Sequence, residues 1–359
     1  MRLKDSQQPI TLGHSELKVS PLCLGTMTFG TAWGWGCGET TARQILGRYL
    51  DAGGNFIDTA EVYTDGASEE MLGRFLAEDG KRQRVVLATK FSLHAAAGEA
   101  DNRGSLRERI TRSLEGSLRR LRTGHIDIYW LHSYDTLAPA QEVMSVLDSL
   151  VQSGKVRYVG LSNVPAWYSA RAQTLAQWRG WNKLCALQLE YSLIERNLER
   201  EHVPAARELG MSICAWSPLA GGFLSGKYNP DGRRLAGSGR LKTIQDHGNK
   251  FCPRFSADDW RVLATVEDIA RDLQRPAAQI AINWVTRQPQ IGSTIIGATQ
   301  FAQMGDILGA LEFDIPPEHA RRLDAVSRPA GTDPYTLFAP EPRRTMSGEV
   351  AVRETVPVG

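Results

Sequence analysis

The sequence predicts an α/β protein whose main domain is a (β/α)8 TIM barrel. Short apolar segments with strand character alternate along the chain with stretches in which apolar residues recur at three- and four-residue spacing. Eight strands that are each followed by a helix match the count of this barrel. A doubly wound open sheet is the competing fold, but no G-x-G-x-x-G motif follows the first strand. The pattern therefore favours the closed barrel.

The expected elements follow a short N-terminal β-hairpin, which pairs residues 10–12 with 17–19 around Gly13-His14. The expected strands are 22–25, 55–58, 85–90, 126–132, 158–162, 184–189, 211–216 and 294–297. The expected amphipathic helices are 41–52, 69–77, 106–121, 141–152, 166–177, 199–209 and 278–287. A long insertion separates strands seven and eight, and it carries the basic loop 232–254 and extra helices such as 257–273.

We expect residues 1–333 to form a single barrel domain. Residues 334–359 are rich in proline and charge and have little periodicity. Such a segment is expected to be a C-terminal tail that is loosely packed or disordered.

The composition indicates a soluble cytoplasmic protein. The chain has 359 residues, 42% of them apolar, and a formal net charge of only +2. This charge gives no reason to expect nucleic acid or a membrane as a partner. Five scattered cysteines without a C-x-x-C pair argue for a reducing compartment and against a metal or disulfide framework. The start is polar, with no apolar stretch typical of a signal peptide, and no run is long enough for a membrane helix.

Ionisable side chains stand at or just beyond the C-terminal ends of three expected strands. Asp58 ends the second strand, and Tyr63 follows in the same loop. Lys90 ends the third strand and His132 ends the fourth. Buried strands that deliver such groups to one end are costly unless the groups meet in one site. A cation beside a phenol favours the phenolate and lowers its pKa, which suits carbonyl reduction and alcohol oxidation.

Residues 58–69 carry the most specific motif in the chain. They read D-T-A-E-V-Y-T-D-G-A-S-E and match every fixed position of D-T-A-E-x-Y-x-x-G-x-S-E, the signature of the aldo-keto reductase superfamily. The resemblance continues in the order L-H (131–132), G-L-S-N (160–163), Q-L-E-Y-S (188–192), W-S-P-L (216–219) and I-I-G-A (295–298). The chain thus resembles this superfamily from about residue 10 to residue 327.

The resemblance implies a catalytic role for the four ionisable residues. Tyr63 would be the general acid, Lys90 would tune it, and Asp58 would hold the lysine. His132 would hydrogen-bond the substrate carbonyl and orient it. Singly, these residues would be read as a buried ion pair and a core histidine, but their convergence at one barrel face favours catalysis.

The resemblance also implies a nicotinamide cofactor, because no protein side chain supplies hydride. Ser162, Asn163 and Gln188 would bind the nicotinamide carboxamide, and Trp216 would stack on the ring. The remaining expected cofactor residues are Thr26, Ser217, Pro218, Leu219, Gly221, Lys227, Arg234, Gly297, Thr299, Gln303 and Asp306. Strand-end capping and core packing are the structural alternatives for these side chains.

The identity of the dinucleotide is less sharply indicated. The resemblance favours NADP(H). NAD(H) is also possible, because Thr299 and Gln303 are neutral at positions where many relatives carry a basic residue. The six basic residues of loop 232–254 would either fold over the cofactor phosphates or stay solvated. No metal is expected.

Trp33 and Trp35 lie in the loop after the first strand, where the superfamily lines the mouth of its pocket with aromatic side chains. With Tyr63 and His132 they are expected to bind the substrate, a small carbonyl compound or alcohol, apolar or aromatic in character. One alternative is a cofactor-binding, redox-sensing regulatory subunit of a channel-type partner. Another is an NAD-preferring sugar or pyridoxal dehydrogenase. A homo-oligomer is possible.

Overall fold

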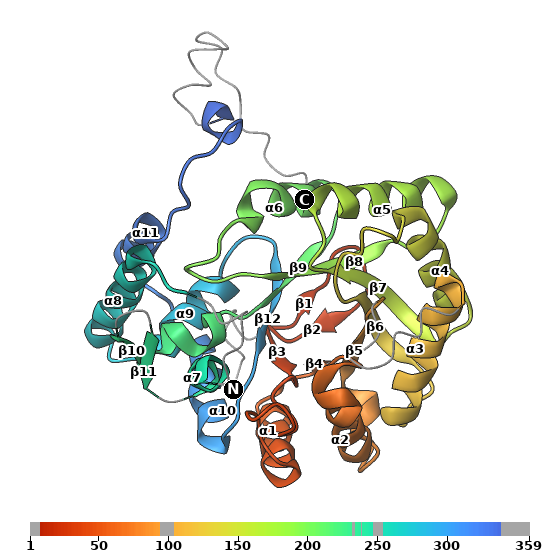
Figure 1. The fold of residues 1–359 in the computed structure, drawn as a ribbon, viewed down its shortest axis with the longest axis horizontal. Helices are drawn as coiled ribbons and strands as arrows, with labels where there is room; N and C mark the ends of the chain where they lie inside the picture. Colours follow the sequence, from red (N-terminus) through yellow and green to blue (C-terminus); the bar gives the residue numbers. More distant parts are fainter. Residues whose placement is uncertain (1–7, 94–103, 232–233, 238, 247–253, 339–359) are drawn as a thin grey trace. The chain divides into compact units, whose positions relative to one another are not determined.

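The computed structural model describes residues 8–93, 104–231, 234–237, 239–246 and 254–338. Eight parallel strands close into a barrel in the order β12-β3-β4-β5-β6-β7-β8-β9 (Figure 1). They are Leu22–Gly25 (β3), Phe56–Asp58 (β4), Val86–Phe91 (β5), Ile126–Leu131 (β6), Val156–Ser162 (β7), Leu184–Glu190 (β8), Ser212–Trp216 (β9) and Ile291–Ile296 (β12). The predicted (β/α)8 barrel is confirmed, and the open sheet is excluded.

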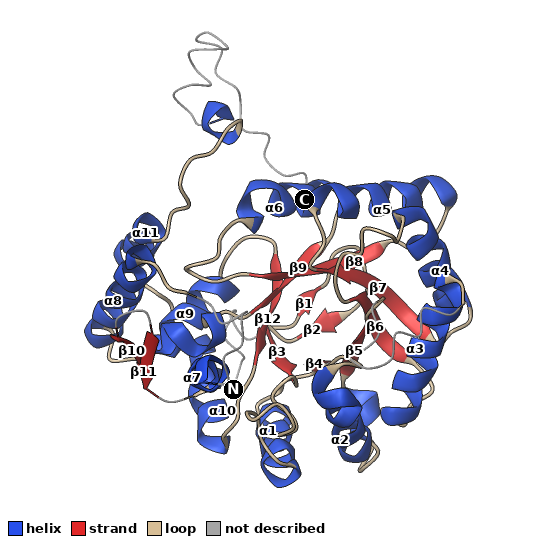
Figure 2. Ribbon diagram, in the orientation of Figure 1, coloured by secondary structure: helices blue, strands red, loops and turns tan. Residues whose placement is uncertain are grey.

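Helices lie around the outside of the barrel (Figure 2). They are Glu39–Asp51 (α1), Ala67–Leu76 (α2), Leu106–Arg120 (α3), Ala140–Gln152 (α4), Ala166–Arg179 (α5), Leu198–Glu208 (α6), Arg240–Asp246 (α7), Ala257–Asp272 (α8), Ala277–Thr286 (α9), Phe301–Leu308 (α10) and Pro317–Val326 (α11). A capping box of Ser105 with Glu108 begins α3, and one of Ser256 with Asp259 begins α8. The extra helix expected at 257–273 is therefore present as α8.

Most residues of the barrel strands are buried, whichever face of the sheet they point to. In β5, Leu87 and Phe91 belong to the apolar layer beneath the helices, whereas Ala88 packs inside the barrel. Lys90 shares the inward side with Ala88, because side chains alternate along a strand. The same alternation turns Ile128 and Trp130 of β6 inward. Strand periodicity therefore delivers a lysine into an otherwise apolar interior.

The expected N-terminal hairpin, Ile10–Thr11 (β1) with Lys18–Val19 (β2), packs against the amino end of the barrel. Leu12 and Val19 are fully buried in the same cluster as the barrel interior. Gly13 has φ +51°, and a Cβ there would lie 2.3 Å from the Cys185 carbonyl oxygen. The Gly13 N–H donates to Ser212 Oγ at 2.8 Å. Only glycine fits this turn, which fixes the hairpin to β8 and β9.

The insertion between β9 and β12 holds more structure than the sequence pattern indicated. An antiparallel hairpin, Tyr228–Asp231 (β10) with Arg234–Gly237 (β11), precedes α7. Along the whole chain, contacts define two units, Met1–Ser327 and Arg328–Gly359. The division predicted at residue 333 stays a prediction, and most of the expected tail, 339–359, lies outside the described residues.

Candidate active site

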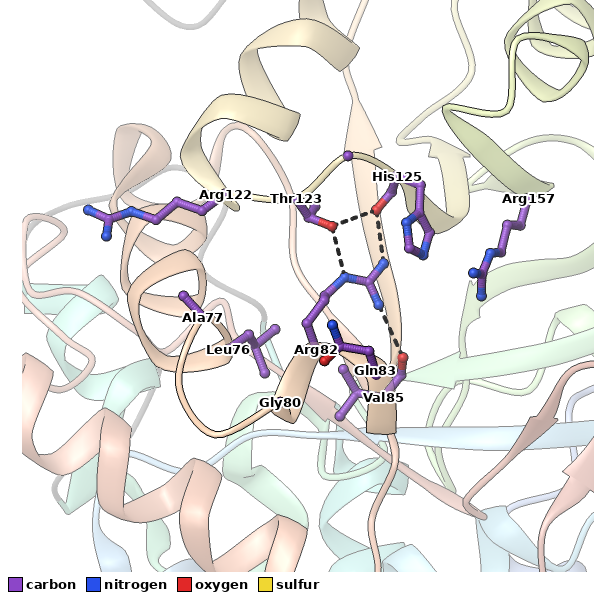
Figure 3. Close-up of a pocket in the computed structure, with 11 residues that line it drawn as sticks. Leu76, Ala77, Gly80, Arg82, Gln83, Val85, Arg122, Thr123, His125 and Arg157 are labelled. Atoms are coloured by element: carbon purple, nitrogen blue, oxygen red, sulfur yellow. Dashed lines mark hydrogen bonds between the residues drawn. The ribbon is translucent and has the colours of Figure 1, made fainter.

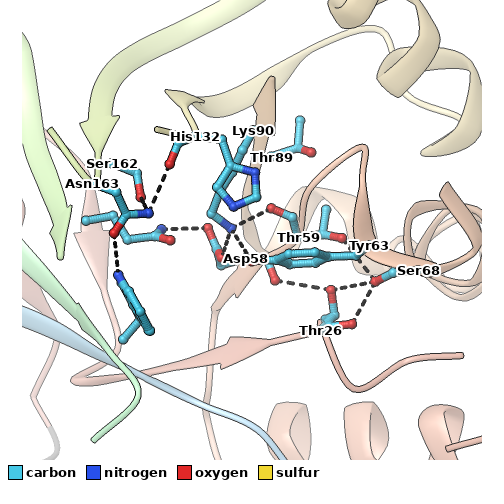
Figure 4. A network of polar contacts seen from close by, with 12 residues as sticks. Thr26, Asp58, Thr59, Tyr63, Ser68, Thr89, Lys90, His132, Ser162 and Asn163 are labelled. Carbon is cyan, nitrogen blue, oxygen red and sulfur yellow. Dashed lines mark hydrogen bonds and ion pairs between the residues drawn. The ribbon is translucent and has the colours of Figure 1, made fainter. Parts of the chain in front are cut away.

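The four ionisable residues meet at the carboxyl end of the barrel (Figure 4). The Lys90 Nζ lies 3.0 Å from the Tyr63 Oη and donates to the Thr59 carbonyl at 2.8 Å. Its third hydrogen bond goes to Asp58 Oδ2 in a buried ion pair. The His132 ring lies edge-on to the Tyr63 ring, with centroids 5.8 Å apart. The structure thus brings together the side chains that the strand-end pattern indicated.

The other residues of the 58–69 motif hold the loop that carries Tyr63. Ser68 Oγ donates to the Thr26 carbonyl, and the Thr26 hydroxyl donates to the Asp58 carbonyl at 3.1 Å. Glu61 accepts the Ser92 N–H at 2.7 Å. Glu69, fully buried, accepts from Thr89 and Arg120. These hydrogen bonds therefore hold the loop that carries Tyr63, and Thr26 takes part in them.

Burial sets the protonation of the site more strongly than the lysine does. Burial raises the pKa of Tyr63, and the Lys90 ammonium lowers it without cancelling that rise. The expectation that the lysine gives the phenol a net-lowered pKa is therefore wrong, because burial has the larger effect. Burial would also depress the pKa of Lys90, but Asp58 and Tyr63 outweigh it and raise the pKa. At neutral pH the site accordingly holds a protonated phenol beside a charged ammonium.

His132 is a neutral side chain at physiological pH. Burial, assisted by the charge of Lys90, lowers its pKa to about 3. A neutral imidazole has one N–H donor and one acceptor nitrogen. It can therefore hydrogen-bond a carbonyl oxygen without delivering a charge to it.

Four residues expected to hold the nicotinamide lie at the carboxyl ends of β7, β8 and β9, and side-chain hydrogen bonds join three of them. The Asn163 Nδ2 donates to Ser162 Oγ and to the His132 carbonyl, both at 3.0 Å. The Trp216 indole N–H donates to Asn163 Oδ1 at 3.0 Å. The Gln188 Nε2 donates to Asp58 Oδ1 at 2.9 Å, so its Oε1 and its second N–H are what it can offer to a ligand. Figure 4 shows Asn163 between Ser162 and the His132 carbonyl, and Asp58 paired with Lys90.

The turn after β9 forms a cradle around the Lys227 ammonium. Ser217, Gly221 and Gly222 all have positive φ. A Cβ on Gly222 would lie 3.0 Å from Lys227 Nζ, and one on Gly239 would lie 2.8 Å from it. Pro218 and Leu219 complete the turn, and no carboxylate pairs with Lys227 within the described ranges. Burial lowers the pKa of Lys227, as expected of a cation that lacks an anion.

Arg240 is a site residue that the sequence did not single out from its basic loop. Its guanidinium carbon lies 4.4 Å from the centre of the Trp35 ring, and its buried Nε has no hydrogen-bond partner. Tyr63 and Glu190 lie near enough to act on its charge. The side chain of Arg234, which the sequence favoured, lies outside the described part of the chain, as do Arg233 and Lys250.

The segment after β12 presents neutral groups to its surroundings. Gln303 Oε1 accepts the backbone N–H groups of Thr299 and Gln300 at 2.9 and 3.3 Å, which caps α10. Gly297 lies beside Thr28, whose buried Oγ1 has no hydrogen-bond partner. Asp306 is exposed on α10, and its carbonyl accepts from Gln279. The structure keeps these positions on one segment, and among the described residues none of them forms an ion pair with a base.

Aromatic side chains line the approach to Tyr63. The Trp33 ring lies 6.5 Å from the Tyr63 ring and 5.5 Å from the Trp35 ring. Tyr134 and Trp167 form a second edge-to-face pair at 5.9 Å. The wall expected from Trp33 and Trp35 is therefore formed next to the phenol.

A cavity of about 640 Å³ lies at the opposite end of the barrel, by the amino ends of β5, β6 and β7 (Figure 3). Arg82 donates there to Thr123 Oγ1 and to the His125 carbonyl, and it pairs with buried Asp127. The guanidinium N–H groups of Arg82 are thus hydrogen-bonded to neighbouring protein groups. We read this cavity as part of the network that joins the strand starts. Elsewhere, no helix in the described ranges is both long and apolar enough to cross a membrane.

The comparisons with known proteins define the class. The sequence profile of the Aldo/keto reductase family matches residues 21–328. The chain belongs to this family, and it is therefore an oxidoreductase of carbonyl and alcohol groups.

Individual relatives cover nearly the full chain. An uncharacterized oxidoreductase, YrpG, of Bacillus subtilis (strain 168) is 37% identical over 332 residues, which is 90% of this chain and 97% of that protein. An aryl-alcohol dehydrogenase (NADP(+)) of Phanerodontia chrysosporium is 31% identical over 336 residues, covering 90% and 86%. The aldo-keto reductase ausK of Emericella nidulans is 30% identical over 351 residues, covering 95% and 87%.

Proposed function

We propose that this protein interconverts an aldehyde or ketone and its alcohol with an NAD(P)(H) cofactor, and that Tyr63 is the general acid and base. One observation carries the proposal. The Tyr63 Oη lies 3.0 Å from a buried Lys90 ammonium, at the open end of a (β/α)8 barrel. When bound, the nicotinamide supplies or accepts the hydride.

The proton chemistry belongs to the chain's own residues. In reduction, Tyr63 gives its proton to the carbonyl oxygen, and the Lys90 charge stabilises the phenolate that remains. Asp58 keeps the lysine protonated and in place. His132, neutral because burial lowers its pKa to about 3, hydrogen-bonds the same carbonyl oxygen and orients it.

The polar groups of the site fit a dinucleotide. Ser162, Asn163 and Gln188 would bind the carboxamide, for which Gln188 offers its Oε1. Trp216, fixed by Asn163, would present its face to the ring. Lys227, with the turn of positive-φ residues beside it, would hold the phosphates.

Arg240 would join Lys227 on the phosphates, because its buried Nε lacks a partner. These two cations favour NADP(H), in line with the name of the Phanerodontia relative. Thr299 and Gln303 add no charge, so NAD(H) remains a possible cofactor. Consumption of NADPH and NADH, followed side by side, tests this preference.

The substrate we propose is an aromatic aldehyde or its alcohol. Trp33 and Trp35 would provide flat apolar surfaces beside Tyr63. Relatives named aryl-alcohol dehydrogenases agree with this class.

The decisive test replaces the phenol. Tyr63→Phe should lower kcat for NADPH-dependent reduction of aromatic aldehydes by about a hundredfold or more, because it removes the proton donor. Cofactor affinity, measured by tryptophan fluorescence, should stay near that of the wild type. Lys90→Met should also lower kcat strongly. Tyr158→Phe, at the amino half of β7, is the matched control and should remain active.

Near-normal turnover by Tyr63→Phe would refute the proposed acid. Slow turnover by the wild type on every carbonyl tried, together with a stable partner complex, would favour the redox-sensing regulatory subunit. A clear preference for NAD with alcohols would instead favour the sugar or pyridoxal dehydrogenase.

A further inference from the structure

The neutral imidazole of His132 can exist as either of two tautomers, and only one of them suits its proposed role. A neutral imidazole carries its single hydrogen on Nδ1 or on Nε2. In the function proposed above, the ring donates a hydrogen bond to the substrate oxygen. The nitrogen that reaches the substrate must therefore be the one that carries the hydrogen. The groups around the ring decide whether it does.

The His132 ring has one hydrogen-bond partner within the described ranges of the chain. This partner is the Ser92 hydroxyl, whose Oγ lies 3.5 Å from Nδ1. The contact is long, and hydrogen bonds of catalytic groups often shorten when the substrate binds. Nε2 has no partner in the same ranges, so it is the nitrogen that a ligand can use.

Backbone hydrogen bonds hold both residues of this contact. Ser92 directly follows β5, and its N–H donates to Glu61 Oε1 at 2.7 Å. The Ser113 hydroxyl donates to the other oxygen of Glu61. The His132 N–H donates at 2.9 Å to the carbonyl of Phe91, the residue before Ser92. The hydroxyl and the ring are therefore brought together by fixed backbone positions on β5 and just after β6.

The direction of the hydrogen bond between Ser92 and His132 determines the tautomer. A hydroxyl that donates to Nδ1 leaves the imidazole hydrogen on Nε2. A hydroxyl that accepts from Nδ1 leaves Nε2 with a lone pair, which cannot donate to a carbonyl oxygen. Only the first arrangement agrees with the role of His132 in carbonyl reduction.

We propose that Ser92 is a positioning residue for the proposed reaction: its hydroxyl donates to His132 Nδ1 and thereby keeps the imidazole hydrogen on Nε2, where it can bind the substrate carbonyl. This inference rests on the function proposed above, because Ser92 acts only through the imidazole. Loss of the hydroxyl leaves the Ser92 backbone and its bond to Glu61 in place, so the loop can keep its course.

The test is Ser92→Ala, examined by ¹⁵N NMR of the full-length protein labelled in histidine. The wild type should show His132 with its hydrogen on Nε2, and His132→Gln identifies the signal by its loss. In Ser92→Ala the Nδ1–H form should become detectable, because nothing then favours one nitrogen. We expect kcat/KM for an aromatic aldehyde to fall about threefold to tenfold, the effect of one neutral hydrogen bond.

Two further variants serve as the rescue and the control. Ser92→Thr keeps a hydroxyl at this position and should restore both the tautomer and kcat/KM. Ser169→Ala removes a buried hydroxyl from α5, where it donates to the Ala166 carbonyl at 2.8 Å. This control should change neither measurement, because Ser169 lies away from the imidazole.

A wild type in which His132 carries its hydrogen on Nδ1 would overturn the inference. An unchanged tautomer in Ser92→Ala would overturn it as well, whatever happens to the rate. The NMR measurement does not depend on turnover, so the two proposals can fail separately. If Tyr63→Phe is inactive while Ser92→Ala keeps the wild-type tautomer, the proposed function stands and the positioning role falls. If Tyr63→Phe turns over normally, the proposed acid falls, whichever nitrogen carries the hydrogen.

Discussion

The ammonium of Lys90 uses its full capacity for hydrogen bonds. Its three protons go to Asp58, to the Thr59 carbonyl and to Tyr63. The three acceptors lie on different sides of the ammonium and together hold it in place. A buried charge is tolerated only in such a setting. The position of the phenol is therefore defined by the lysine as much as by its own loop.

Trp216 allows a test at the same scale. Trp216→Phe removes the hydrogen bond to Asn163 and reduces the face offered to a nicotinamide ring. We expect cofactor affinity to fall several-fold and the fluorescence quenching on cofactor addition to shrink. Trp178→Phe, on the exposed face of α5, should leave both unchanged. Undiminished quenching in Trp216→Phe would remove this residue from the proposed cofactor site.

The sequence located Asp58, Tyr63, Lys90 and His132 because strand ends and one specific motif marked them. It could not single out Arg240, since one base in a run of six looks like the others in sequence. The signal appears only in three dimensions, as a buried Nε that has no hydrogen-bond partner among the described residues. The net pKa of Tyr63 was also beyond the sequence, because burial and charge oppose each other there.

At the scale of elements, the β9–β12 insertion places one of the described basic residues, Arg240, against an aromatic ring. The β10–β11 hairpin and α7 bring Arg240 against Trp35, which is distant from it in the sequence. The sequence indicated a basic loop, but sequence alone could not show which of its six basic residues lies near the site. Repeating strands and helices are predictable from periodicity, whereas this short hairpin has no periodic signal.

Arg240→Met tests the contribution of this element. Losing a charge-assisted contact to a phosphate should weaken NADPH binding by about tenfold, with a smaller effect on kcat. Fluorescence titration and steady-state kinetics would separate the two effects. Arg171→Met, on the exposed side of α5, is the control and should bind as the wild type does. Unchanged affinity in Arg240→Met would place the phosphates elsewhere.

At the scale of the whole molecule, the site makes the fold sensitive to acid. His132 stays neutral in the folded protein down to about pH 3, whereas an unfolded chain protonates histidine near pH 6.5. Its folded pKa is depressed, so its contribution to stability is intact above about pH 6.5 and is lost as the pH falls below it. The barrel therefore carries a stability cost for holding a neutral imidazole at its mouth.

Denaturant unfolding at pH 7 and pH 5 measures this cost. The wild type should lose about 2 kcal/mol more than His132→Gln over this interval, because only the wild type couples unfolding to this protonation. His319→Gln, on α11, should lose as much as the wild type. An identical loss in wild type and His132→Gln would mean that the imidazole already titrates in the folded state.

The N-terminal hairpin also determines how molecules reach the site. Leu12 and Val19 close the amino end of the barrel, and they pack against the side chains that fill the barrel interior. In the function proposed above, cofactor and substrate would both enter by the carboxyl ends of the strands. Whichever of the two lies deeper would bind first and leave last, because the N-terminal hairpin closes the other end of the barrel.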